Sequence, residues 1–357
     1  MKIVKCIAAA LAVTGASVQA EDLKKVTIGV GTQVLNVTYP WLMMPKTLGY
    51  WKDQGLDVSV VPVNGSLGAA QMLTAGTIDF AQMNAGAAIQ SNVKAGMDLK
   101  LVMTNTPLDW SIVVPADSGI KIAADLAGKT VGMFSVGTAG NALLRSYLNE
   151  NGVDLDDVGV VATGAGAPAL LALENGSVDA LMFWASMNLT MENMGADLTY
   201  LFSDSWREMP DFSLVARQSL IDEDPELVEK IVRGAVMGTE FAMASPECTR
   251  ITHWAAYPDT KPGGAPDEDT AALWDDRALD LTLTAINAVR EASGGTHWGA
   301  VPLDGLGLLQ DYLVETSQID ATLPIESYVV GIPGFFDAVS AFDHAAVQAD
   351  AEICAAR

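Results

Sequence analysis

The sequence predicts an α/β fold built from two similar halves, each with a parallel-rich sheet flanked by helices. Short apolar segments alternate with helical segments punctuated by glycine, which is typical of parallel strands joined by helical crossovers. The same alternation starts again after Ala127-Gly128-Lys129. Residues 73–80 (LTAGTIDF) are echoed by residues 173–180 (LENGSVDA), and each copy combines a helix end, a glycine cap and an apolar–Asp entry into a strand. We therefore expect two half-domains with one plan.

The first half begins with an apolar strand and a polar turn that carries Gly31 and Thr32. Asn64 opens a helix that Gly76 closes, and Asn84 opens the next helix. The expected strands are residues 26–30, 57–62, 78–83 and 99–104, and the expected helices are residues 40–50, residues 64–75 and the segment after residue 84.

The second half repeats this order, with strands expected at residues 130–134, 158–162 and 178–184 and helices at residues 139–151 and 168–174. The extended segments 112–115 and 212–216 lie on either side of this block, as they would if the chain left one domain and later returned to it. We therefore expect residues 116–211 to form a lobe inserted into a first lobe. The first lobe would comprise residues 21–115 and 212–357, joined to the second by two crossover segments.

The region after Asp224 is predicted to be helical. Asp224, Pro225 and Glu226 form a good helix start, because proline is favoured at the first helical position. Helices are expected at residues 226–244, 270–291 and 303–316, with a Pro/Gly-rich loop at residues 258–266.

The N-terminus has the layout of a cleavable secretory signal peptide. Lys2 and Lys5 precede an apolar run at residues 6–13 that is too short to span a bilayer. Val18 and Ala20 are small residues of the kind that signal peptidase accepts. Cleavage after Ala20 and a periplasmic location are therefore expected, and the alternative is an N-terminal helix that anchors the chain to the membrane.

The net charge and the cysteines indicate which macromolecular partners, disulfides and metal sites to expect. A net charge of −24 argues against nucleic acid and anionic membrane surfaces. We expect Cys248 and Cys354 to pair in an oxidising compartment, and two buried thiols are the alternative. Neither cysteine has a nearby His at metal-ligand spacing, and no complete dinucleotide fingerprint or phosphate loop occurs. Neither a metal nor a cofactor is expected.

Four predicted loops follow strands and feed helix N-termini, which is where ligands bind in open parallel sheets. They are rich in Gly, Ser, Thr and Asn, so their N–H and hydroxyl groups suit a small polar group; ordinary helix capping is the alternative. The loop residues expected to bind the ligand are Thr32, Asn64, Gly65, Ser66, Asn84, Ala85, Ser135, Gly137, Thr138 and Ala139.

Aromatic residues near these loops have the shape to stack on a flat or apolar ligand. Tyr39, Trp41, Trp110 and Trp184 are therefore assigned to the site. Trp184 is expected to emerge at the carboxyl end of its strand. The alternative for each ring is packing in the core.

Acidic residues lie beside both crossover segments. Asp211 is assigned to the site, and Asp109 has the same two interpretations: it accepts a ligand N–H or cation, or it is a solvated acid. His253, His297 and His344 all lie in the C-terminal region, away from the loops. No nucleophile elbow or zinc-protease motif occurs, so acid–base chemistry would rest on carboxylates alone and no enzymatic activity is expected.

Several motifs, in this order, resemble the periplasmic substrate-binding proteins of ABC importers, in the branch for nitrate, sulfonate, taurine and thiamine-pyrimidine ligands. They cover about residues 26–244. The motifs are residues 49–58 (GYWKDQGLDV), 73–79 (LTAGTID), 125–132 (DLAGKTVG), 173–180 (LENGSVDA) and 225–228 (PELV). The resemblance implies that these motifs are scaffold.

The resemblance also implies a type II periplasmic-binding-protein clamshell, with two lobes that close on one small ligand and dock on an ABC permease. A monomer is expected. The absence of Lys and Arg from the loops disfavours an inorganic anion, and the aromatic residues favour an organic ligand such as a heterocycle or an aromatic acid. Fungal thiamine-pyrimidine synthases share the fold, but their Lys and cleft His are not apparent. A periplasmic ligand sensor and, more weakly, a secreted carboxylate-dependent enzyme remain as alternatives.

Overall fold

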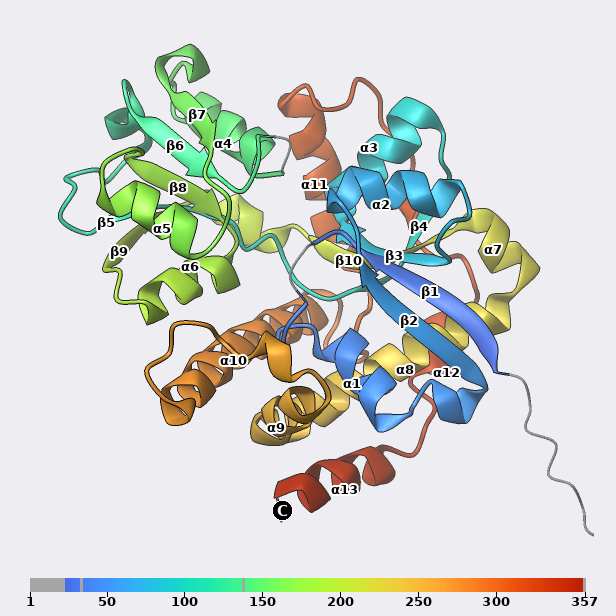
Figure 1. The fold of residues 1–357 in the computed structure, drawn as a ribbon. Helices are drawn as coiled ribbons and strands as arrows, with labels where there is room; N and C mark the ends of the chain where they lie inside the picture. The colour runs from blue at the N-terminus through green and yellow to red at the C-terminus, as the bar shows by residue number, and fades with distance from the viewer. Residues whose placement is uncertain (1–22, 33–34, 137–138, 356–357) are drawn as a thin grey trace, which may run out of the picture.

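The structure is a computed structural model that describes residues 23–357 apart from 33–34, 137–138 and 356–357 (Figure 1). The predicted signal peptide and its cleavage site after Ala20 lie outside the described residues. Within the described part of the chain, no helix has both the length and the apolar character needed to cross a membrane.

The molecule contains two separate five-stranded sheets, one at the upper left and the other on the right in Figure 1. In each sheet, one strand runs antiparallel to both of its neighbours and the other strands are mutually parallel. The first sheet has the order β2 (Leu56–Pro62), β1 (Lys24–Val30), β3 (Phe80–Asn84), β10 (Phe212–Arg217) and β4 (Leu99–Thr104). The second has the order β7 (Gly159–Ala162), β6 (Thr130–Met133), β8 (Ala180–Phe183), β5 (Ser111–Pro115) and β9 (Leu198–Leu201). The two sheets therefore have the same topology, as the repeated sequence pattern predicts.

Helices flank both sheets, and the C-terminal helices pack around them. The helices between strands are α1 (Pro40–Leu48), α2 (Gly65–Thr74), α3 (Ala85–Ala95), α4 (Ala139–Glu150), α5 (Ala167–Glu174) and α6 (Ala185–Asn193). After the last strand come α7 (Gln218–Glu223), α8 (Pro225–Ala244), α9 (Pro246–Ala256), α10 (Glu268–Ala292), α11 (Leu303–Glu315), α12 (Phe335–Val339) and α13 (His344–Ala355). The expected α/β fold of two parallel-rich sheets is confirmed.

The repeated apolar–Asp motif has the same structural role in both halves. The Asp79 carboxylate accepts a hydrogen bond from the Thr27 backbone N–H at 2.8 Å, and the Asp179 carboxylate accepts one from the Thr130 N–H at 2.9 Å. The Asp79 and Asp179 N–H groups donate back to the carbonyls of the same threonines. Each aspartate thereby fastens the entry of one strand to the start of the neighbouring strand.

The two extended segments expected at the crossovers are the antiparallel strands β5 and β10. All strands of the second sheet lie between β4 and β10 in the sequence, so the chain leaves the first sheet and later returns to it. Ser111–Pro115, which the expected boundary would leave with the first lobe, is hydrogen-bonded within the second sheet. The division into residues 21–115 with 212–357 and residues 116–211 stays a proposal.

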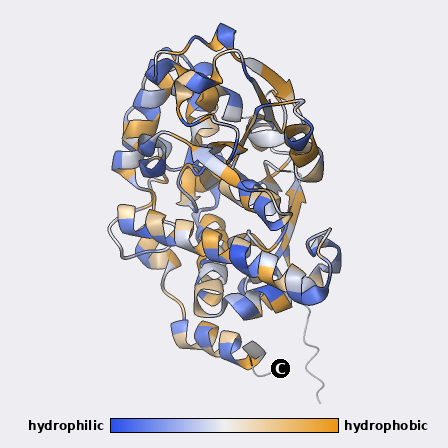
Figure 2. Ribbon diagram, turned by 90° about the vertical axis from the view of Figure 1, so that its left-hand side faces the viewer, coloured by the Kyte–Doolittle hydropathy of each residue, from blue (hydrophilic) through white to orange (hydrophobic). Residues whose placement is uncertain are grey.

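The core follows the strands, which are mostly hydrophobic in Figure 2, whereas the helices alternate in polarity along their length. One cluster of buried apolar side chains runs from Leu101 in the first sheet through Leu309 of α11 to Val131 in the second sheet. The C-terminal helices also tie the halves together from the side: Arg277 of α10 forms an ion pair with Glu192 of α6. The two sheets are thus connected by packed helices as well as by the crossover strands.

Cys248 is buried in α9, and its thiol donates a hydrogen bond to the Ala351 carbonyl of α13 at 3.0 Å. Cys354 lies one turn further along α13, but its side chain is outside the described part of the chain. The Cys248–Cys354 disulfide therefore stays a prediction.

Candidate functional site

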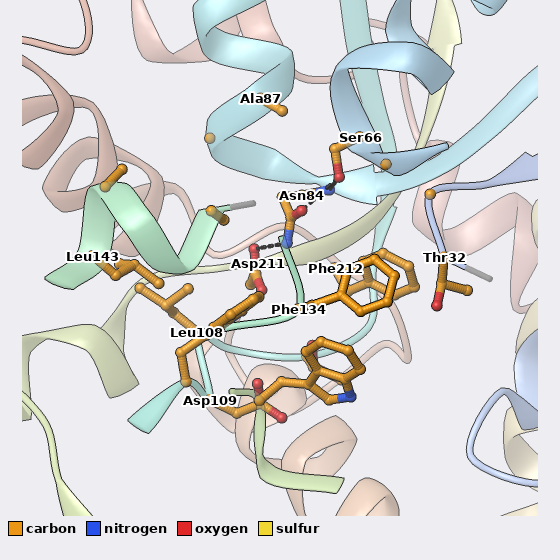
Figure 3. A pocket seen from close by; sticks show the side chains of 18 of the residues that line it. Thr32, Ser66, Asn84, Ala87, Leu108, Asp109, Phe134, Leu143, Asp211 and Phe212 are labelled. Atoms are coloured by element: carbon orange, nitrogen blue, oxygen red, sulfur yellow. Dashed lines mark hydrogen bonds between the residues drawn. The ribbon is translucent and has the colours of Figure 1, made fainter. Parts of the chain in front are cut away.

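A cavity of about 510 Å³ lies where loops and helix N-termini from both sheets meet (Figure 3). Its volume falls within the range of small-molecule sites in proteins. The wall includes residues that follow β1, β3, β6 and β8, the two crossover segments and parts of α10 and α11. This is the end of the sheets at which the sequence predicts the ligand.

Most of the residues assigned to the site from the sequence line this cavity. They are Thr32, Tyr39, Trp41, Asn64, Gly65, Ser66, Asn84, Trp110, Ser135, Ala139, Trp184 and Asp211. Gly137 and Thr138 lie outside the described residues. Ala85 is not among the lining residues: its side chain is buried in the core, and its backbone N–H donates to the Asp211 carbonyl at 2.7 Å. Its amide is therefore already used within the fold.

A chain of polar side chains forms the wall contributed by the first half (Figure 3). The Ser66 hydroxyl donates to the Asn84 side-chain oxygen and accepts the Asn84 backbone N–H at 3.0 Å. The Asn84 side-chain amide donates to the Asp211 carboxylate at 2.6 Å. The first turn of α2, the end of β3 and the start of β10 are held together by these bonds, which preorganise the Asp211 carboxylate.

Asp211 is a buried acid, and burial raises its pKa to about 7. Hydrogen bonds from Asn84 and Trp110 lower the pKa, while the nearby Asp109 charge raises it further. The carboxyl group of Asp211 therefore titrates close to neutral pH.

Asp109 occupies the other crossover, and burial raises its pKa to about 6. The Arg207 charge and the Ala185 backbone N–H, the first of α6, partly counteract that rise. Arg207 does not line the cavity: its guanidinium donates to the carbonyls of Leu108 at 2.6 Å and Trp110 at 3.1 Å. From the sequence, Asp109 was expected either to accept a ligand N–H or cation or to be a solvated acid, and it was not assigned to the site; in the structure it lines the cavity.

Aromatic rings form two edge-to-face groups around the cavity. The Tyr39 ring lies 5.7 Å from Trp41 and 5.9 Å from Phe212, and Trp110 lies 5.5 Å from Trp184, all between ring centroids. Trp41 is almost fully buried and donates its indole N–H to Gln82, so it is mainly a core residue whose edge reaches the cavity. Trp184 is partly exposed, as expected of a ring available for stacking.

Gly140, in the first turn of α4, allows this helix to pack closely against Trp110 and Met182. A Cβ atom at residue 140 would lie 2.7 Å from the Trp110 ring and 3.1 Å from the Met182 side chain. Only glycine allows α4 to approach the Trp110 ring so closely.

The C-terminal helices supply lining residues that the sequence analysis missed. Helix α10 contributes Leu281, Thr282 and Ala285, and the α11 region contributes Leu309, Tyr312, Leu313 and Gln318. Gln318 accepts a hydrogen bond from Gln90 of α3 at 3.1 Å. These residues carry no local motif, and only the packing of the helices brings them to the cavity.

The charge of the cavity is one-sided. Among the described residues that line it, the only charged groups are Asp109 and Asp211, and none is Lys, Arg, His or Cys. In the described part of the chain, no three His, Cys, Asp or Glu residues are placed to hold a metal ion. The cavity is therefore chemically suited to binding through carboxylates, amides, hydroxyls and aromatic faces.

Comparison with known proteins identifies the family. Residues 39–249, more than half of the chain, match the NMT1/THI5-like family. The chain belongs to the NMT1/THI5-like family. This confirms the resemblance to periplasmic substrate-binding proteins of the nitrate, sulfonate and taurine type. Two proteins named "putative binding protein", from Brucella abortus (strain 2308) and Brucella suis (biovar 1, strain 1330), are each 31% identical over 205 residues, 56% of this chain and 61% of theirs.

Solved structures of low sequence identity share the fold. A protein from Bordetella bronchiseptica RB50 is 21% identical with a TM-score of 0.65, and the match covers 94% of this chain and 99% of the other. The periplasmic aliphatic sulphonate-binding protein SsuA from Escherichia coli is 16% identical with a TM-score of 0.61, covering 86% and 92%. The desulfurization enzyme DSZB is also 16% identical, with a TM-score of 0.57, covering 88% and 98%. A binding protein and an enzyme thus share this fold.

Proposed function

We propose that this protein is an extracytoplasmic solute-binding protein that captures a small organic ligand between two lobes and delivers it to an ABC importer. The observation that carries the proposal is the cavity itself, because both sheets and both crossover strands contribute to its wall. A ligand in this position touches both halves at once and so stabilises the arrangement in which they are close. The binding proteins among its relatives support the same function.

The proposed partners follow from the transport role. They are one small organic ligand and the permease subunits of an inner-membrane importer, with the binding protein acting as a periplasmic monomer. The predicted signal peptide supports that compartment, and the net charge of −24 makes nucleic acid an unfavourable partner.

Two other functions use the same architecture. A periplasmic sensor would present its ligand-bound form to a receptor instead of a permease, and the cavity would be the same. A secreted enzyme is the weaker alternative: DSZB shares the fold, but here the described lining offers two carboxylates and no Cys, His or Lys for nucleophilic or acid–base chemistry.

The test begins with the native ligand. The protein is purified from the periplasm, small molecules are released by denaturation, and mass spectrometry identifies what co-purified. The identified compound should be returned unchanged after incubation with the protein, and it should reduce the radius of gyration measured by small-angle X-ray scattering. Vesicles that contain the permease and ATPase encoded by neighbouring genes should take up the compound only in the presence of the binding protein. Chemical conversion of the compound, or transport that does not depend on the protein, would contradict the proposal.

A further inference from the structure

The two acids of the cavity occupy equivalent positions in the two halves. Each crossover strand begins within an Asp–aromatic–Ser sequence. Asp109-Trp110-Ser111 leads into β5, and Asp211-Phe212-Ser213 leads into β10. The strand pairing places Asp211 beside Ala85, the first residue of α3 after β3. It places Asp109 beside Ala185, the first residue of α6 after β8. Both carboxylates line the same cavity, so the topology concentrates negative charge between the sheets.

Among the described residues that line the cavity, neither acid has a counter-charge. Asp211 receives hydrogen bonds from the neutral groups of Asn84 and Trp110. The Arg207 charge lowers the pKa of Asp109, but the Arg207 guanidinium does not line the cavity. Its N–H groups donate to backbone carbonyls of the crossover segment and to the Ser111 hydroxyl. A carboxylate offers about four lone-pair sites, more than these donors fill. A cationic ligand would supply the missing charge, whereas an anion would add to the repulsion.

The rest of the wall combines hydrogen-bonding groups with aromatic rings. Thr32, Ser66 and Asn84 contribute hydroxyl and amide groups, and both halves contribute rings, among them Phe212 from the first half and Trp184 from the second. A ligand that fills about 510 Å³ therefore meets both polar groups and aromatic faces. This combination suits a molecule with a polar nitrogen group at one end and a flat apolar body.

We propose that the cavity binds an organic cation, a protonated amine or amidinium on a flat apolar body, through Asp109 and Asp211. The inference rests on the proposed function as a solute-binding protein and names its ligand class. It sets this chain apart from the sulphonate-binding protein whose fold it shares, because a sulfonate would bring a third negative charge beside the buried carboxylate of Asp211 and the partly buried carboxylate of Asp109.

The direct test uses three indole probes of similar shape that differ in charge: tryptamine as the cation, tryptophol as the neutral isostere and indole-3-propionate as the anion. Calorimetry on the ligand-stripped, full-length mature protein at pH 8 should give at least tenfold tighter binding of tryptamine than of tryptophol, with indole-3-propionate weakest. Equal affinities for the three probes, or tightest binding of the anion, would overturn the inference.

Two shape-conserving variants locate the effect. Asp109→Asn and Asp211→Asn should each weaken tryptamine binding at least tenfold and change tryptophol binding by less than threefold. Asp117→Asn, a change at an exposed acid away from the cavity, is the matched control and should alter neither. Circular dichroism checks that each variant is folded. The probe series on the unaltered protein decides the question even where a variant does not fold.

The native ligand separates this inference from the proposed function. A co-purified cation that closes the protein supports both. A co-purified anion that closes the protein would overturn the ligand class and leave the transport role standing. The absence of any small molecule or probe that binds would count against the solute-binding function, and the inference would fall with it.

Discussion

The two halves of this molecule have one topology and two chemistries. The sheet orders β2-β1-β3-β10-β4 and β7-β6-β8-β5-β9 correspond strand for strand. Yet β3 of the first half ends at Asn84, whereas the equivalent strand β8 is followed by Trp184. Strand β1 is followed by Gly31 and Thr32, whereas the equivalent strand β6 is followed by Phe134 and Ser135. The repeated backbone places equivalent strand ends around one cavity, and the residues at these ends differ in polarity between the two halves.

Residues that keep their identity in both halves do not all have the same role. Asp79 and Asp179 make the same backbone hydrogen bonds to Thr27 and Thr130, away from the cavity. Asp109 and Asp211 are also equivalent, but both line the cavity. Equivalence alone therefore does not distinguish scaffold from site, and the predictions below test each kind of pair.

The largest expected effect separates Asp211 from Asp109 by their response to pH. In each case the folded-state pKa is raised above 3.8, so the stability linked to the protonated form is complete below pH 3.8 and is lost as pH rises through about 7 for Asp211 and about 6 for Asp109. Asp211→Asn should therefore raise the unfolding free energy of the ligand-free protein at pH 8 by about 2–4 kcal/mol. Asp109→Asn should raise it less, because Arg207 partly neutralises Asp109.

Urea titrations of the three proteins at pH 5 and pH 8 measure this difference. No His lines the cavity in the described part of the chain, and burial raises the pKa of Tyr39 to about 12, so neither kind of group titrates there between these pH values. A pH dependence that survives Asp211→Asn unchanged would show that this carboxyl is already ionised at pH 5.

A second prediction compares two helix glycines, one from each half. Gly140→Ala should destabilise the protein by about 1–3 kcal/mol, because its Cβ would overlap the Trp110 ring at 2.7 Å. Gly68→Ala in α2 is the matched control: its Cβ would meet no atom within 4 Å, so it should stabilise the helix by about 0.5–1 kcal/mol. Thermal unfolding of both variants gives the two signs, and a stabilising Gly140→Ala would refute the close fit.

The third prediction concerns the aromatic side of the cavity. Trp184→Ala should weaken binding of the identified ligand by about 1–3 kcal/mol if the ring stacks on it. Trp184→Phe keeps an aromatic face and should recover part of the loss. Calorimetry measures both, and unchanged affinity in Trp184→Ala would assign the ring to packing against Trp110 and Phe183 instead.

The smallest effect should be the same in both halves. Asp79→Asn and Asp179→Asn keep the side-chain shape but weaken a charge-assisted hydrogen bond, so each should cost about 1 kcal/mol of unfolding free energy. Ligand affinity should not change, because neither residue lines the cavity. Losses that differ widely between the two variants would break the equivalence of the motifs.

Sequence reasoning reached the sheets and the loops because their signals are local. Alternating strands, helix-closing glycines and the repeated apolar–Asp pair each depend on neighbours in the chain, and the strand β4 at Leu99–Thr104 has the predicted bounds. Strand β3 was expected at residues 78–83 but spans Phe80–Asn84, because Asp79 bonds back to Thr27 at the strand entry.

Other features depend on packing that no local pattern reveals. Helices α6, α7, α9, α12 and α13 and strand β9 were not predicted, and the lining residues of α10 and α11 lie far from the loops in sequence. Ala85 was assigned to the site because a helix N-terminus looks the same in sequence whether its amide faces a ligand or, as here, a neighbouring carbonyl. The sequence contained the repeated Asp–aromatic–Ser segment, but only the structure shows that the aspartates of both copies line one cavity.

The bond between α10 and α6 bears on how fast a ligand could enter and leave. Helix α10 lines the cavity and also joins the second half through Arg277, so any separation of the halves on this side must break the Arg277–Glu192 pair. Both side chains are partly in water, with exposures of 46% and 29%, and such pairs contribute about 1 kcal/mol or less. The need to break this ion pair would therefore slow separation of the halves by no more than about fivefold. The residence time of the ligand would be governed mainly by the contacts of the ligand itself.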